Sequence, residues 1–121
     1  MLELTKRFYV EEKTIQLANK IQELSKKQQN LDNSQDLALD KQKTIGKEFK
    51  DISKELDQLV KDNQGLKDPM SLPDLKEIEN DVNESLVKSE EKLFKKDNIS
   101  AKKEQEKSSK KMQEMSNKIQ N

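Results

Sequence analysis

The feature that most limits the fold of this chain is the spacing of its aliphatic side chains, which recur alternately four and three residues apart. The clearest stretch carries its apolar side chains at Ile45, Phe49, Ile52, Leu56 and Leu59. This spacing places them on one face of an α-helix that packs against another helix. A β-strand would need alternation at every second residue, and no stretch of the sequence supplies it. The predicted fold class is therefore all-α, with antiparallel helical hairpins in a coiled-coil-like four-helix arrangement.

The composition favours narrow helical seams over a thick core. Of the 121 residues, 40% are charged and 30% are hydrophobic, whereas a compact domain is usually nearly half apolar. A coiled-coil seam needs only about two apolar residues in every seven. Low hydrophobicity is also typical of disordered chains. However, the 24 basic and 24 acidic side chains cancel, and the regular apolar spacing favours folded helices.

Three polar breaks divide the chain, and they lie at 32–34, 65–73 and 97–98. The helices predicted between them cover residues of about 5–31, 35–64, 72–96 and 99–120. Connections this short make neighbouring helices antiparallel. We therefore expect a long hairpin over residues 1–66 and a second, shorter hairpin over residues 67–121. The sequence leaves open whether the two hairpins merge into one bundle or stand in tandem.

The breaks contain residues that are typical of helix ends. Gly65 is expected to close the second helix in the left-handed conformation. Ser71, followed by Pro73 in the first turn, is a start signal for the third helix. The candidate caps of the second and fourth helices are, respectively, Asp32 or Ser34 and Asn98 or Ser100.

The apolar positions predict a packing seam on every helix. Its members share the four-three spacing and are Leu17, Ile21, Leu24, Ile45, Phe49, Ile52, Leu56, Leu59, Val82, Leu86, Met112, Met115 and Ile119. Thr14 and Gln28 fall at the same spacing in the first helix, where a polar side chain is expected to weaken the seam locally. Leu93 and Phe94 are assigned to the seam of the third helix. Phe8, with Tyr9, could dock another element or cover the end of the bundle.

The last two helices are predicted to carry opposite charges. Acidic residues predominate from 74 to 91, and lysines predominate from 92 to 118. An exposed ion pair contributes only about 0.2 to 1 kcal/mol. The pattern is therefore expected to select the partner helix more than to stabilise it.

The side chains that most enzymes use are missing from this sequence. It has no histidine, cysteine or tryptophan, which removes the commonest general base, the usual zinc ligands and thiol nucleophiles. Its two glycines, Gly46 and Gly65, lie too far apart for a phosphate-binding loop. We therefore predict a non-enzyme without catalytic residues, cofactor or metal site. Zero net charge argues against nucleic acid as a partner, and no apolar run is long enough to span a bilayer.

A lysine-rich tract in the last helix supports an alternative. Lys102, Lys103, Lys110 and Lys111 could contact a lipid surface or another polyanion. The acids between them and the lack of aromatic side chains favour a solvated helix face instead.

One further pattern is a resemblance. The segment Leu56-Asp57-Gln58-Leu59 leads into Pro69-Met70-Ser71-Leu72-Pro73-Asp74, then an acidic helix, then a lysine-rich helix that ends in 110–115. This resembles the helical middle region of large bacterial membrane-anchored envelope proteins of unknown function. The resemblance implies a segment of a larger protein on the periplasmic or envelope side of a membrane, with no catalytic residues to transfer. The residues themselves leave a cytoplasmic location open.

The expected function is therefore that of a non-catalytic helical structural or interaction module. Its expected partners are the flanking regions of a parent chain, another helical protein or a second copy.

Overall fold

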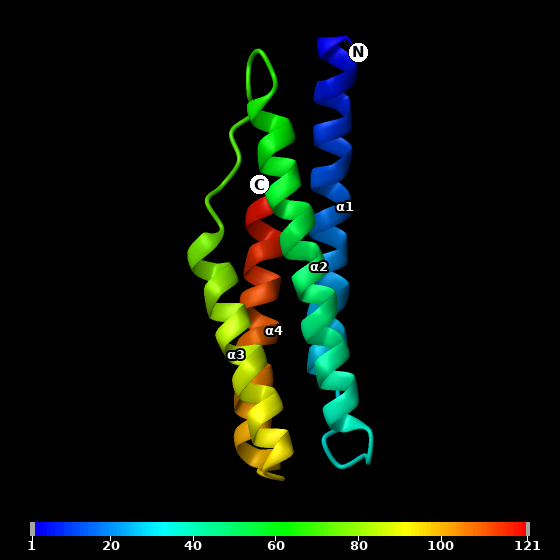
Figure 1. Cartoon of the computed structure of the whole chain (residues 1–121), viewed down its shortest axis with the longest axis vertical. Coiled ribbons are helices and arrows are strands. Elements are labelled where there is room, and N and C mark those ends of the chain that lie inside the picture. The colour runs from blue at the N-terminus through cyan, green and yellow to red at the C-terminus, as the bar shows by residue number, and fades with distance from the viewer. Residues whose placement is uncertain (1, 121) are drawn as a thin grey trace.

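The computed structural model describes residues 2–120, and these form the predicted all-α fold (Figure 1). The helices are α1 (Glu3–Gln29), α2 (Ala38–Gln64), α3 (Lys76–Phe94) and α4 (Asn98–Gln120). Consecutive helices run in opposite directions along one long axis. Within the described residues no β-strand is present, so the predicted fold class is confirmed.

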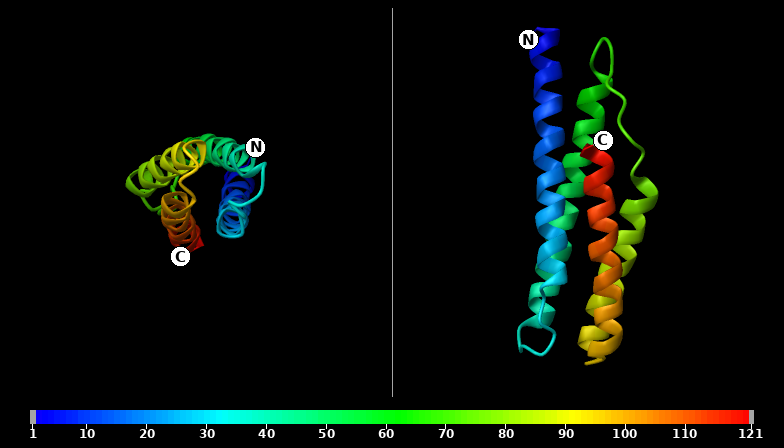
Figure 2. Two further views of the ribbon diagram at one scale, coloured as in Figure 1. Left: turned by 90° about the horizontal axis from the view of Figure 1, so that it is seen from below. Right: turned by 180° about the vertical axis from the view of Figure 1, so that it is seen from behind.

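The four helices form one bundle in which each helix packs against two others. α1 packs against α2 and α4, and α3 packs against the same two helices. Seen from behind in Figure 2, α4 lies between α1 and α3. A single apolar core includes residues from all four helices. The hairpins α1–α2 and α3–α4 therefore share their core, which decides between the two arrangements that the sequence left open.

The predicted seam residues lie in this core, and all thirteen of them are buried. Phe94 is the exception among the apolar residues assigned to the third helix, because its side chain is 76% exposed. It is the last residue of α3, and Leu93 takes the inward position instead. Leu93 packs with Ala38 and Ala101 in a small second cluster at this end of the bundle.

Small side chains let α1 and α4 approach closely. The Ser25 hydroxyl donates to the backbone carbonyl of Ser109 at 2.8 Å, and the Ser109 hydroxyl donates back to the carbonyl of Ser25 at 3.1 Å. Seven residues further along α4, the Ser116 hydroxyl donates to the carbonyl of Ala18 at 2.8 Å. A short side chain can reach the backbone of the neighbouring helix only when the two helices lie very near each other. These bonds therefore fix both the separation of α1 and α4 and their register.

Buried amides join three helices near the α1–α2 connection. Gln28 and Gln42 exchange two hydrogen bonds of 2.8 Å each. Gln105 donates to the Oε1 atom of Gln42 at 3.0 Å, and it also exchanges two bonds of 2.8 Å with Asn33. The three glutamines are almost completely buried, and a buried polar group is stable when its hydrogen bonds are satisfied. The expectation that Gln28 only weakens the seam is therefore incomplete, because it belongs to a network that links α1, α2 and α4.

The end of α2 and the start of α3 differ from the sequence prediction. At both places the path of the link between the helices, and not the residue type, determines the backbone conformation. Gly65 has a φ of −76°, so the predicted left-handed conformation is wrong. Its N–H still bonds the carbonyl of Lys61, and Leu66 is buried just beyond it. α3 begins at Lys76, later than predicted, and Ser71 and Pro73 lie in the non-helical link before it.

The left-handed residue in the described chain is Lys96, with a φ of 60°. It follows α3, and the N–H of Asp97 bonds the carbonyl of Lys92 at 2.9 Å across it, as in a Schellman motif. Asp97 then caps α4, because its carboxylate accepts the N–H of Ser100 at 3.1 Å. Hydrogen bonds from Ser100 hold the pKa of Asp97 below its usual value. Neither predicted cap of α4 has this role.

The caps predicted for α2 are also wrong. Asp32 accepts the N–H of Ser34 at 3.0 Å and its hydroxyl at 2.6 Å, which closes a turn within the connection. α2 begins only at Ala38, and Leu37 before it makes no side-chain capping bond.

Replacing Gln42 with Ala tests the buried amide network. The substitution removes both bonds between Gln42 and Gln28 and the bond that Gln42 accepts from Gln105, and we expect a loss of about 2–4 kcal/mol in unfolding free energy. Urea denaturation followed by circular dichroism measures it. Gln58→Ala is the control, because Gln58 is exposed and bonds only Asp62 through its side chain. A Gln42→Ala variant as stable as this control would show that the network contributes nothing.

Candidate interaction surface

The first turns of α1 extend beyond the described end of α4. The bonds Ser25–Ser109 and Ala18–Ser116 define an antiparallel register between these helices. Continuing that register places Gln120 level with Thr14 in α1. Residues 3–13 therefore form an overhang of about 16 Å, at 1.5 Å per residue. Figure 1 shows this end of α1 reaching well past the end of α4.

An exposed apolar stripe begins on the overhang with Leu4 and Phe8 and ends at Ile15, just beyond the overhang. The exposed fractions of Leu4, Phe8 and Ile15 are 79%, 61% and 56%. Steps of four and seven residues place the three side chains on one face of the helix. Leu4 also lies two seven-residue steps before Ala18, whose backbone accepts the bond from α4. Leu4 is therefore in line with the face that α4 covers, whereas Ile15 is level with Ile119 of α4 and lies on the open flank of that face.

The overhang is fastened to the rest of the bundle on its other side. Val10 is buried in the shared core. The carboxylate of Glu3 accepts the N–H of Lys67 at 2.9 Å, and Arg7 donates to the carbonyl of Asp68 at 2.9 Å. The α2–α3 link thus holds α1 in place while the apolar stripe stays open to solvent.

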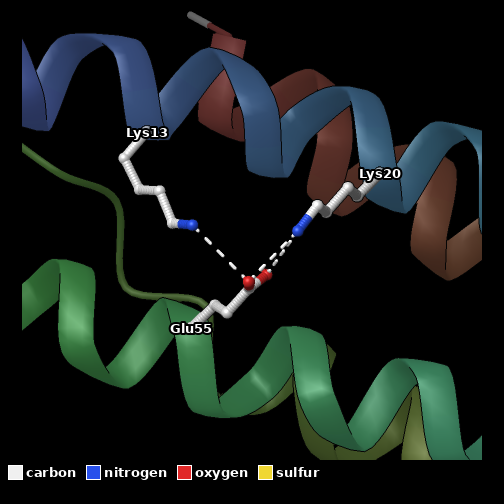
Figure 3. Close-up of polar contacts among 3 residues, drawn as sticks. All are labelled: Lys13, Lys20 and Glu55. Carbon is white, nitrogen blue, oxygen red and sulfur yellow. Dashed lines mark hydrogen bonds and ion pairs between the residues drawn. The ribbon is translucent and has the colours of Figure 1, made fainter.

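Ion pairs connect α1 with α2 (Figure 3). Glu55 accepts Lys20 at 3.1 Å and Lys13 at 3.5 Å. One heptad further, Lys27 pairs with Glu48 at 3.2 Å. Desolvation raises the pKa of Glu55, but the hydrogen bond from Lys20 and the two lysine charges outweigh it, so that the pKa is lower than usual.

The charge pattern of the sequence predicts pairing mainly in the other hairpin, α3–α4. Among the described residues, the ion pair between α3 and α4 is Lys111–Asp81, at 3.7 Å. The signal for the α1–α2 pairs was the seven-residue spacing of Lys13, Lys20 and Lys27. The α1–α2 ion pairs could have been predicted from this spacing, because charged residues that flank an apolar seam every seven residues select partner helices.

The four lysines predicted as an anion contact do not share one face of α4. Lys102 donates to the carbonyl of Gln29 in α1, whereas Lys111 pairs with Asp81 in α3. These two side chains therefore extend to opposite flanks of the helix. Lys103 and Lys110 are exposed.

No group of acidic side chains within residues 2–120 is arranged so that it could hold a metal ion. In the same range, none of the helices combines the length and the apolar character of a membrane span. Comparison with known protein families, curated proteins and solved structures finds no match to this chain.

The ion pairs of Glu55 predict a pH dependence of stability. Because the folded pKa is below the ordinary value of 4.5, ionised Glu55 stabilises the fold above that pH. The contribution is lost as the pH falls from about 4.5 through the folded pKa, and for a partly exposed pair we expect at most about 1 kcal/mol. Thermal unfolding of the wild type and Glu55→Gln should therefore differ at neutral pH and converge in acid. The control is Glu12→Gln, at an exposed position of α1. A difference that persists unchanged into acid would contradict the assignment.

Proposed function

We propose that the chain is a non-catalytic helical interaction module that docks another helix on the apolar stripe of α1. The observation that carries this proposal is the exposure of Leu4 and Phe8 on the overhang, with Ile15 exposed one heptad beyond Phe8. Burial of apolar surface contributes about 25 cal/mol for each Å² removed from water. Contiguous exposed apolar side chains on a folded protein are typical of interaction sites.

A second copy of the chain is the occupant that the charges favour. The basic pair 6–7 precedes the aromatic residues Phe8 and Tyr9, and the acidic pair 11–12 follows them. In an antiparallel α1–α1 contact centred near Tyr9, the exposed Lys6 of one copy lies opposite the exposed Glu12 of the other, whereas Arg7 and Glu11 pair with each other within α1 at 3.8 Å. Such a contact uses the same surface on both copies, as in a two-fold symmetric dimer. Charge complementarity of this kind favours one orientation over others.

The resemblance noted in residues 56–74 and 110–115 supports a wider proposal. The chain would be a segment of a larger membrane-anchored protein of unknown function, on the envelope side of the membrane. Flanking regions of that parent chain, or another helical protein, are then further candidates for the stripe.

The polyanion alternative on α4 stays a prediction. Its strongest remaining support is the pair Lys103 and Lys110, which are both exposed. The opposite directions of Lys102 and Lys111 weaken the case for one continuous anion-binding face on this helix.

Sedimentation velocity over a range of concentrations tests the docking proposal. The wild-type chain should self-associate, and Phe8→Glu with Ile15→Glu should weaken the dimer by at least about tenfold, or 1.4 kcal/mol. Phe94→Glu with Ile99→Glu is the matched control, because it changes two apolar residues at the opposite end of the bundle that are more exposed than Phe8 and Ile15. A wild type that stays monomeric at millimolar concentration, or an equal effect of both double variants, would contradict the proposal.

A further inference from the structure

A groove runs between α2 and α3, on a side of the bundle away from the α1 overhang. It has a volume of 640 Å³, and α2 contributes Gly46, Ser53 and lysines to its lining. From α3 come Asn83, Val87 and Glu90, among others. Small side chains on α2 explain why the space is open. A Cβ atom added at Gly46 would meet only the Glu90 carboxylate, at 3.6 Å.

One polar atom of this lining has no partner. The Oγ atom of Ser53 is buried and makes no hydrogen bond within the described residues. Nearly all buried polar atoms in folded proteins have a hydrogen-bond partner. This hydroxyl has almost no accessible surface, so it lies behind the wall of the groove and is not itself open to a ligand.

A stripe of lysines borders the groove on α2. Lys43, Lys47, Lys50 and Lys54 follow one another at steps of four, three and four residues, so that they lie along one face of the helix. They span about 16 Å at 1.5 Å per residue. All four are exposed, and none forms an ion pair with the described residues. Like charges at this spacing repel one another. A bound anion would reduce the electrostatic repulsion among the four lysines.

The α3 edge of the groove has no basic side chain, and it presents Val87 between the polar Asn83 and the carboxylate of Glu90. Val87 is 62% exposed there, and Leu86 beside it reaches into the core. A ligand that fits both edges therefore carries negative charge toward the lysines of α2 and apolar surface at Val87, and it keeps its acidic groups away from Glu90.

We propose that this groove docks an acidic amphipathic helix of a partner protein. Carboxylates spaced by three or four residues on that helix would pair with the four lysines, and its apolar face would cover Val87. The groove lies between two helices, and such a hollow accepts a third helix in the helix-in-groove manner. The lining has no aromatic side chain on which a nucleic-acid base could stack. A concave surface also fits a cylinder better than it fits a flat lipid surface.

This inference goes beyond the proposed self-association, because the groove uses another face and a partner of different chemistry. Its test therefore uses the full chain with Phe8→Glu and Ile15→Glu as background, so that binding does not depend on dimer formation. The probe is a fluorescein-labelled peptide of Glu, Leu and Ala in an amphipathic helical order. A scrambled peptide of the same composition is its control.

Fluorescence anisotropy should show saturable binding of the amphipathic peptide at low salt, and the binding should weaken as salt is added. Lys47→Glu with Lys50→Glu should reduce the affinity by at least about tenfold. Lys103→Glu with Lys110→Glu changes the net charge equally but lies on α4, and it should leave the affinity within about twofold of the background.

The variant Gly46→Leu distinguishes loss of binding through a blocked groove from loss of binding through a destabilised fold. Leucine is a better helix former than glycine, so the variant should unfold at a higher urea concentration and yet lose the peptide. Any one of three results would overturn the proposal: no peptide binding at low salt, equal binding of the scrambled peptide, or unchanged affinity in both groove variants. Binding of anionic vesicles or single-stranded DNA without binding of the peptide would overturn it too, and would assign the lysines to another polyanion.

Discussion

The close contact between α1 and α4 is the constraint on which the bundle depends. A chain with only 30% hydrophobic residues cannot hold two separate hairpins together with a thick apolar layer. Instead, α4 presents small side chains, and the hydroxyls of Ser109 and Ser116 bond the backbone of α1 directly. Because backbone carbonyls are present at every turn, serine can serve here in place of large apolar groups. The larger side chains of α2, such as Phe49, then complete the core from the other side.

The same contact explains what the sequence could and could not predict. The burial of residues such as Leu17 and Leu56 can be predicted from helical periodicity alone, since an apolar face must be buried whichever helix covers it. The partner of Gln28 is different, because its bonds with Gln42 exist only in the register that the whole bundle adopts. Nothing local to Gln28 reveals that register. The two hairpins could be predicted, but their union through α4 could not.

Helix ends and charges show the same division between local and tertiary signals. Gly65 is the residue best suited to a left-handed position, yet the left-handed residue is Lys96. The tight connection after α3 imposes that conformation, whereas the longer link after α2 does not require it. The net charge of a helix did not predict which helices form ion pairs with each other. The heptad positions of Lys13 and Lys20 predict the α1–α2 pairs better. The first prediction rested on a local helix-end signal and the second on the net charge of a helix, whereas the tertiary arrangement decides both.

The surface outside the core divides into parts that the fold uses and parts that it leaves open. Ion pairs such as Lys20–Glu55 are internal, because both partners belong to the packed α1–α2 hairpin. The stripe at Phe8 and the lysines beside Gly46 have no such partner within the described residues, although their spacing is as regular as that of the core. Regular spacing without an internal partner is the feature on which both docking proposals rest. This contrast is the physical basis for proposing an interaction module.

The central claim is that α4 makes the two hairpins one cooperative unit, and native-state amide hydrogen exchange tests it most directly. Amides near Phe49 in α2, Val82 in α3 and Met112 in α4 lie in the shared core. We expect their most protected N–H groups to exchange with the same opening free energy, equal to that of global unfolding. A lower opening free energy shared by α3 and α4, with α1 and α2 still protected, would show that the hairpins unfold separately and would contradict the account.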